Sequence, residues 1–329
     1  MVGNPPGRPR YNIEQDERLK PVIWRVNQQA SIHKRLSGMR KIVDYSNQYV
    51  LTVNCKTAAG IVAGIASYLT ERGGYIAELS QFDDKITGQF FLRTLFNITT
   101  ESKHTFEDIR NGFDKLAEKH GIKWSMHDVS TPTKVLIMVS KFDHCLVDLL
   151  YRYNKGELNI DITAIVSNHQ DLQSIVEREG FRFIYLPVTP DTKAEKEAEL
   201  LDIINETGTD LVVLARYMQI LSDDLCKHLH GRAINIHHSF LPGFKGAKPY
   251  HQAYERGVKL IGATAHYVTA DLDEGPIIEQ SVLPVSHAYY PDELVSLGRD
   301  TETKALASAV KLHAENRVLI SGNKTIIFK

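Results

Sequence analysis

Continuous apolar runs alternate with helical segments through the second half of the chain, and this rhythm constrains the fold more than any other feature. The runs lie at 135–139, 162–166, 183–186, 211–215 and 233–236. Strands that are apolar on both sides are typical of a parallel sheet covered by helices on both faces. We therefore expect an open, mostly parallel sheet. Its helices are expected at 144–153, 172–179, 192–205 and 223–229.

The sequence on either side of this segment follows other rhythms. Residues 47–127 alternate as strand, helix, strand, strand, helix and strand, which is the order of a ferredoxin-like sandwich. Its expected strands are 49–53, 75–82, 89–97 and 122–126, and its expected helices are 60–69 and 106–120. After residue 260 we expect added antiparallel strands at 261–269 and 276–285, a helix at 291–315 and a hairpin around 321–323. The sequence thus predicts an α/β chain in three parts: an N-terminal extension at 1–46, the sandwich at 47–128 and the open-sheet domain at 133–329.

Charge and residue usage exclude several classes of protein. The formal net charge of −1 gives no general attraction to nucleic acid or to anionic membranes. No apolar run approaches the roughly 18 residues of a membrane span, and the first residues lack the apolar segment of a secretory signal. Three scattered cysteines, Cys55, Cys145 and Cys226, favour a reducing compartment over a disulfide framework or a structural zinc site. We therefore expect a cytoplasmic protein that binds neither nucleic acid nor membrane.

Asn235 and His237 stand at the end of the last apolar run, where open α/β sheets bind their ligands. Because they are two apart in an extended chain, their side chains share one face of the sheet. An amide beside an imidazole suits a reaction in which a carbonyl oxygen gains negative charge, since both can donate to that oxygen and histidine can move a proton. The alternative is structural, with Asn235 capping a turn and His237 satisfied in the core.

Two turns and a set of histidines are ambiguous in the same way. The tight segment 241–246 is either a substrate wall or a connection to the next helix. The turn 271–276 is either solvated or, if folding brings Asp273 to His237, the source of a carboxylate that orients the imidazole ring. A metal site is the remaining alternative, although the histidine spacing matches no metalloprotease helix motif and no cysteine is near. Its candidate ligands are His237, His238, His251 and His266.

The ordered run of residues from 234 to 278 resembles the signature of the folate-dependent formyltransferase family. It contains Ile234–Pro242, continues through Gly262–His266 and ends with Asp273–Ile278. The form His-His-Ser-Phe-Leu-Pro, with His238 at a position where the transferases carry proline, is similar to that of the formyltetrahydrofolate deformylases. Upstream, the segment Thr87–Arg93 resembles part of an ACT regulatory domain.

This resemblance implies a fold and an activity. The fold is an N-terminal ferredoxin-like ACT sandwich followed by an open, mostly parallel sheet of the formyltransferase type. The activity is hydrolysis of 10-formyltetrahydrofolate to tetrahydrofolate and formate, which supplies formate to purine and one-carbon metabolism and needs no metal or other cofactor. By their positions in the motif, the implied catalytic residues are Asn235, His237 and Asp273. The residues implied to bind folate are Arg216, Met218, Gln219, Ile220, Leu221, His266 and Thr269.

Two other activities are compatible with these features. A formyltransferase acting on a phosphorylated amine needs a phosphate cradle after the first strand of the sheet, but the segment 139–145 contains no glycine. The other alternative is a catalytically silent folate sensor, against which the intact set Asn235, His237 and Asp273 argues. An ACT domain suggests an amino-acid effector, yet Cys55-Lys56-Thr57 stands where such domains often carry Cys-Pro-Asp. Edge strands that commonly pair between copies predict a homo-oligomer.

Overall fold

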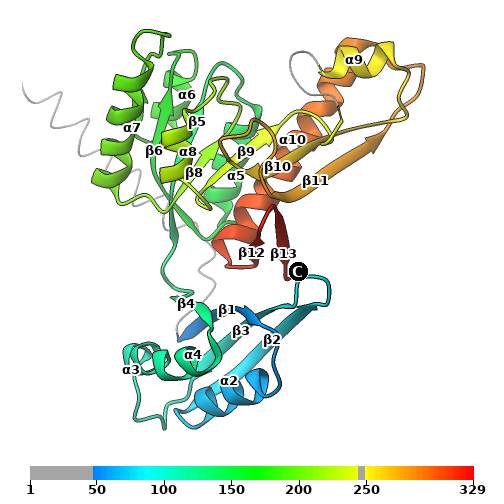
Figure 1. The fold of residues 1–329 in the computed structure, drawn as a ribbon. Coiled ribbons are helices and arrows are strands. Elements are labelled where there is room, and N and C mark those ends of the chain that lie inside the picture. Colours follow the sequence, from blue (N-terminus) through cyan, green and yellow to red (C-terminus); the bar gives the residue numbers. More distant parts are fainter. Residues whose placement is uncertain (1–46, 244–248) are drawn as a thin grey trace, which may run out of the picture. The chain divides into compact units, whose positions relative to one another are not determined.

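The computed structural model describes residues 47–243 and 249–329 (Figure 1). The predicted N-terminal extension at 1–46 lies outside the described residues, and so do positions 244–248, which include the end of the predicted 241–246 loop. The described residues form a four-stranded sheet, a seven-stranded sheet and a two-stranded hairpin. No helix among them is long and apolar enough to cross a membrane.

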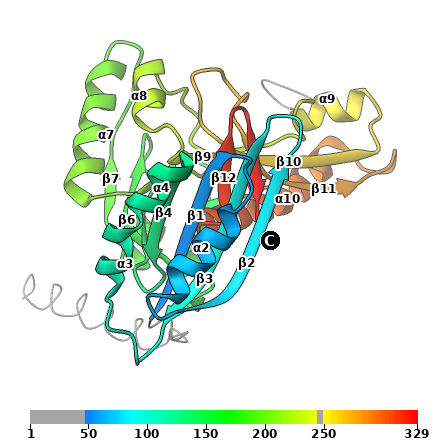
Figure 2. The same ribbon diagram turned by 60° about the horizontal axis from the view of Figure 1, so that its bottom comes forward.

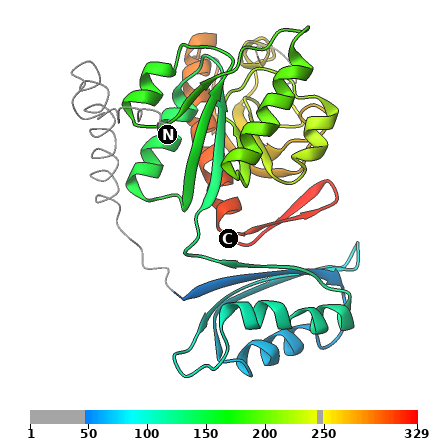
Figure 3. The same cartoon turned by 90° about the vertical axis from the view of Figure 1, so that its left-hand side faces the viewer.

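The four-stranded antiparallel sheet carries its helices on one face, as Figures 2 and 3 show from two sides. Leu51 and Val53 alternate along the first strand toward the helices, where Ile65 and Leu69 bury the same core. The strand order is β2-β3-β1-β4, so the predicted ferredoxin-like arrangement is confirmed. Its elements are β1 (Gln48–Lys56), α2 (Ile61–Thr70), β2 (Gly74–Asp84), β3 (Gln89–Ile98), α3 (Phe106–Gly112), α4 (Asp114–His120) and β4 (Lys123–Asp128).

The single helix predicted at 106–120 is wrong in one respect, because the structure divides it into α3 and α4. The division falls at Phe113, whose amide donates to the carbonyl of Arg110 and so tightens the turn. This turn brings the fully buried Phe113 ring edge-on to the rings of Tyr68 and Trp124. The free energy gained by burying the Phe113 ring outweighs the free energy of one continuous helix. The periodicity of the residues alone does not reveal this balance.

The seven-stranded sheet has the order β11-β10-β9-β8-β5-β6-β7. Its strands β5 to β9 run parallel, whereas β10 pairs antiparallel with both β9 and β11, as predicted. The parallel strands are β5 (Thr133–Val139), β6 (Ile160–Ser167), β7 (Phe183–Tyr185), β8 (Leu211–Leu214) and β9 (Ala233–His237). The added strands are β10 (Leu260–Tyr267) and β11 (Ile277–Pro284).

Helices cover both faces of this sheet (Figure 1). The side chains of β5 alternate between the two faces. Val135 and Ile137 belong to a core shared with α5, α6 and α10, whereas Leu136 and Met138 belong to a core shared with α7 and α8. This alternation explains why the strands are apolar at every position. The helices are α5 (His144–Lys155), α6 (Gln173–Arg178), α7 (Lys193–Thr207), α8 (Asp223–His228), α9 (Pro249–Glu255) and α10 (Pro291–Ala314), and β12 (Val318–Ser321) and β13 (Lys324–Ile327) form the final hairpin.

Candidate active site

Strands β9 and β10 bring together residues that lie far apart in the sequence. In their antiparallel register, His266 stands opposite Asn235 and Thr264 stands opposite His237. The Asn235 amide Nδ2 donates to Nε2 of His266 over 3.3 Å. His237 is only 5% exposed, so the end of β9 offers a buried imidazole next to a half-buried amide.

Asp273 reaches the same place from the turn that follows β10. Its Oδ2 atom lies 3.2 Å from Nδ1 of His237, and its Oδ1 atom lies 3.7 Å from Nε2 of His266. Asp273 adopts a φ of 58°, in the left-handed region that is costly for most residues other than glycine. The neighbouring Gly275 permits this approach, because a Cβ atom there would lie 1.7 Å from the carbonyl oxygen of Tyr267.

The electrostatics of this group favour an ionised carboxylate. Burial raises the pKa of Asp273, but the hydrogen bonds from His237 and His266 outweigh burial, so the pKa lies well below its ordinary value. His266 Nδ1 lies 2.9 Å from the main-chain oxygen of Tyr267 and therefore carries a proton that it donates there. With Nδ1 protonated, a neutral ring accepts from the Asn235 amide at Nε2, whereas a charged ring donates from Nε2 toward Asp273.

Every residue predicted for the site lines one cavity of about 210 Å³. The predicted set is Asn235, His237, Asp273, Arg216, Met218, Gln219, Ile220, Leu221, His266 and Thr269. Met218 and Ile220 are 51% and 61% exposed, so their side chains form an apolar rim, whereas Arg216 is 8% exposed. The main-chain N–H of Met218 donates to Ser140 Oγ over 3.0 Å, so one donor of the segment expected to face the pterin is already engaged.

A buried carboxylate, Glu302 of α10, pairs with Arg216 of the cavity lining and was missed from the sequence. Its Oε2 atom lies 2.8 Å from Nε2 of His144 and 3.4 Å from Nη1 of Arg216, and Tyr250 donates to its Oε1 over 3.0 Å. Burial raises the pKa of Glu302, but His144 and Arg216 outweigh burial and lower it below the ordinary value. A signal existed in the sequence, because Glu302 falls on the buried stripe of α10 that also carries Leu306 and Val310.

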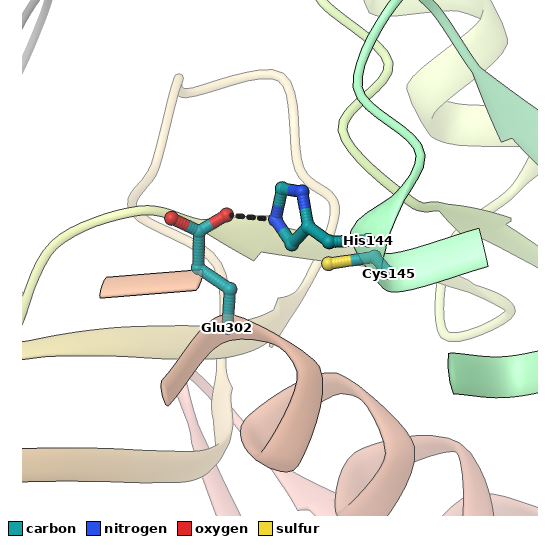
Figure 4. Close-up of side chains that lie close together, drawn as sticks. All are labelled: His144, Cys145 and Glu302. Atoms are coloured by element: carbon teal, nitrogen blue, oxygen red, sulfur yellow. Dashed lines mark hydrogen bonds and ion pairs between the residues drawn. The ribbon is translucent and has the colours of Figure 1, made fainter. Parts of the chain in front are cut away.

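His144, Cys145 and Glu302 offer three potential metal-ligand atoms within 4.8 Å of one another (Figure 4). Two observations favour a hydrogen-bonded cluster over a bound cation at this point. Burial, followed by the charge of Glu302, raises the pKa of Cys145 well above its ordinary value, so its thiol stays protonated. The guanidinium of Arg216 already supplies positive charge to Glu302.

His238 lies between the two carboxylate clusters. Its ring centroid is 5.3 Å from that of His237 and 6.4 Å from that of Tyr250. Burial and then the charge of Arg216 lower the pKa of His238 from 6.5 to about 4, so the ring is neutral at physiological pH. Of the histidines in the predicted metal alternative, His237 and His266 both contact Asp273.

Comparison with known proteins connects this geometry to a family. Residues 133–310 match the protein family described as formyl transferase. A formyltetrahydrofolate deformylase of Corynebacterium sp. (strain P-1) is 50% identical over 282 residues, which cover 86% of this chain and 98% of that protein. The chain belongs to the formyltetrahydrofolate deformylase family.

Solved structures agree with this assignment. A formyltetrahydrofolate deformylase from Burkholderia mallei has a TM-score of 0.82 at 52% identity, covering 86% of this chain and 100% of that one. A glycinamide ribonucleotide transformylase from Symbiobacterium toebii has a TM-score of 0.57 at 28% identity, covering 60% of this chain and 95% of that one. The likeness to the deformylase therefore extends over more of the chain than the likeness to the transformylase, and the predicted formyltransferase-type sheet is confirmed.

Proposed function

We propose that this protein hydrolyses 10-formyltetrahydrofolate to tetrahydrofolate and formate, and that Asn235, His237 and Asp273 carry out the reaction. The observation that carries the proposal is the convergence of these three side chains in one cavity with the segment expected to bind folate. An amide donor, an imidazole and a carboxylate are the groups that acyl transfer to water requires. Membership of the deformylase family supports the same substrate.

In the proposed reaction, the formyl group on N10 lies between Asn235 and His237, and water held by His237 and Asp273 attacks its carbon. The contact between Asp273 and Nδ1 of His237 orients the ring and stabilises its protonated form. The Asn235 amide and protonated His237 then donate to the oxyanion. A proton passes to N10, the C–N bond breaks and formate leaves.

The folate lies, in this proposal, against the predicted segment from Arg216 to Leu221, with His266 and Thr269 on the other side. Exposed main-chain groups and the apolar rim of this cavity suit a pterin, which has both polar edges and flat faces. His266 has a second role in this proposal, because its contact with Asn235 orients the amide that faces the formyl oxygen.

Water rather than an amine is the proposed acceptor, and the turn after β5 supports this choice. A phosphorylated amine would require main-chain donors at that turn. Instead, Ser140 Oγ there accepts from Met218 and donates to Asn168, and His144 pairs with Glu302. The side chains of this turn therefore brace the site itself. The amine-dependent transferase and the silent folate sensor are the competing outcomes of the test below.

The proposal also assigns separate tasks to the predicted domains. Residues 133–329 carry the catalytic sheet, and residues 47–128 form an ACT-type regulatory domain that responds to an amino-acid effector. Arg93 of β3 donates to the main-chain oxygens of Glu315 and Asn316, directly after α10, over 3.1 and 3.2 Å. Because α10 also carries Glu302, this contact offers a route from the sandwich to the site.

We further propose that the protein acts in the cytoplasm as a homo-oligomer, whose size sedimentation would measure.

The deciding experiment follows formate and tetrahydrofolate together, with chelator present and with amines such as glycinamide ribonucleotide added in turn. Equal amounts of both products without amine are expected. Product that forms only with an amine would make the protein a transferase, and folate binding without turnover would make it a sensor. Activity that is abolished by chelator and restored by a divalent ion would instead support a catalytic metal. Its ligands would come from the set His237, His238, His251 and His266.

A further inference from the structure

The cavity that holds the catalytic groups has one permanently charged cation in its lining. Arg216 is the only lysine or arginine among the described residues that line it, and this residue is only 8% exposed. Its backbone adopts a φ of 65°, in the left-handed region that a residue with a long side chain rarely occupies. Such a conformation persists only where surrounding contacts hold it, and it concentrates at functional sites.

The contacts of the guanidinium leave part of its hydrogen-bonding capacity unused. Nη1 lies 3.4 Å from Oε2 of Glu302, and Cζ lies 5.0 Å from the ring centroid of Phe142. Nε is buried and has no hydrogen-bond partner among the described residues. A buried donor without a partner is costly, and a ligand that reached Nε from the cavity that Arg216 lines would complete it.

The proposed reaction creates an anion in this cavity. Water and a neutral formamide give a neutral amine, a formate anion and one proton, so the product carries a charge that the substrate lacks. Formate appears beside Asp273, whose pKa lies well below its ordinary value and which is therefore already negative. Two carboxylates at short distance repel each other strongly where water is excluded, so the product needs a cation or must leave at once.

We propose that the Arg216 guanidinium binds the formate product, with Nε and a neighbouring nitrogen donating to its two oxygens. This inference rests on the hydrolytic function proposed above and identifies where its anionic product binds. Parallel donation from two nitrogens is the strongest way in which arginine recognises a carboxylate. Glu302 keeps the guanidinium in position and, by its own charge, keeps formate from binding so tightly that it would block turnover.

Depth in the cavity distinguishes formate from the other carboxylates of the substrate. The glutamate tail of a folate lies at the far end of the molecule from the pterin. When the pterin occupies the pocket, this tail therefore extends out through the mouth of the pocket. The exposed rim side chains Met218, Ile220 and Leu272 are apolar. Arg216, by contrast, is buried and pairs with Glu302, whose other partner, Tyr250, lies beside His238. The cation therefore lies toward the reacting groups and away from the rim.

Product inhibition by sodium formate tests the proposal, with substitutions at the two ends of the ion pair. Glu302→Gln keeps the shape of the side chain but removes the opposing charge, so the inhibition constant of formate should fall by about three- to tenfold. Arg216→Gly combined with Glu302→Gln removes both charges and suits the left-handed backbone, so the constant should rise by about tenfold or more. Tyr250→Phe is the matched control, because it removes a partner of Glu302 without touching Arg216, and it should leave the constant within about twofold.

Opposite shifts in the two charge variants support the proposal, since a merely structural defect would move both in one direction. An unchanged inhibition constant in the double variant overturns it. Preferential loss of affinity for tetrahydrofolate over tetrahydropteroate, which lacks the glutamate, also overturns it, because Arg216 would then bind the folate tail. If the double variant does not fold, Arg216→Lys serves instead: it keeps the charge but loses Nε, and should weaken formate inhibition by about threefold or more. Failure of the wild-type protein to release formate would reject the proposed function itself and is measured separately.

Discussion

Asp273 and Glu302 are both carboxylates with lowered pKa values, but their partners differ. Asp273 sits in a strained turn and contacts the imidazoles of His237 and His266. Glu302 sits within a 24-residue helix and is held by a guanidinium, a phenol and His144. Burial and a lowered pKa therefore do not by themselves identify a catalytic group. What distinguishes the two is position, because Asp273 and both of its histidines line the cavity, whereas Glu302 and His144 do not.

The largest effect is expected at Asp273. Asp273→Asn should lower kcat by about 10³ or more, because the amide can neither accept a proton nor stabilise the imidazolium. The variant should still fold, since asparagine tolerates the left-handed conformation at least as well as aspartate. Steady-state kinetics and circular dichroism measure the two results. If the variant retains more than about a tenth of the activity, Asp273 lowers the activation free energy by less than ~1.4 kcal/mol, which would contradict its assignment as a catalytic residue.

The next effect is expected at the amide beside that carboxylate. Asn235→Ala should lower kcat by roughly 10²–10³, which corresponds to the loss of one oxyanion donor. The dissociation constant for tetrahydrofolate should change much less, because the pterin is held by the segment 216–221. Equilibrium binding and turnover on the same variant separate the two effects. Weak folate binding with little change in kcat would assign Asn235 to substrate recognition instead.

Substitution of Glu302 should have the opposite effect to substitution of Asp273, because it should lower the free energy of unfolding more than it lowers kcat. Glu302→Ala leaves Arg216 buried without its counter-ion and empties a fully packed position, so the free energy of unfolding should fall by about 3 kcal/mol. Denaturant titration measures this loss, and Lys304→Ala, on the same helix but exposed, is the control with little expected change. A stable Glu302→Ala protein that had lost all turnover would erase the distinction between the two carboxylates.

The smallest effect concerns His238, which lies between the clusters. Its pKa falls from 6.5 to about 4 on folding, so below pH 6.5 the unfolded chain takes up a proton that the folded chain does not. Stability therefore decreases as the pH falls toward 4, by about 2 kcal/mol between pH 8 and pH 5 for this ring. Unfolding titrations at several pH values should show His238→Gln losing less stability than the wild type over that range. Identical pH profiles would mean that His238 is not held neutral by its surroundings.

The sequence by itself determined the architecture of both sheets. Apolar runs such as 135–139 predicted strands buried on two faces, because each residue of β5 packs against helices on one side or the other. The two-residue spacing of Asn235 and His237 placed both on one face of a strand end, and this spacing was visible without any tertiary information. Periodicity and spacing are local properties, so a linear pattern records them fully.

Only the tertiary structure decided which distant groups meet. Nothing in the turn 271–276 states that Asp273 touches His237 and His266. The resemblance to a family implied only that Asp273 and His237 share a catalytic site, and the contact with His266 came from the structure. The pairing of Glu302 with Arg216 was invisible, although its position on the buried stripe of α10 marked it as unusual. Periodicity shows which face of a helix is buried, but the identity of the atoms it meets depends on how elements far apart in the chain pack together. That packing creates the charges, the strain and the unpartnered donor on which the chemistry depends.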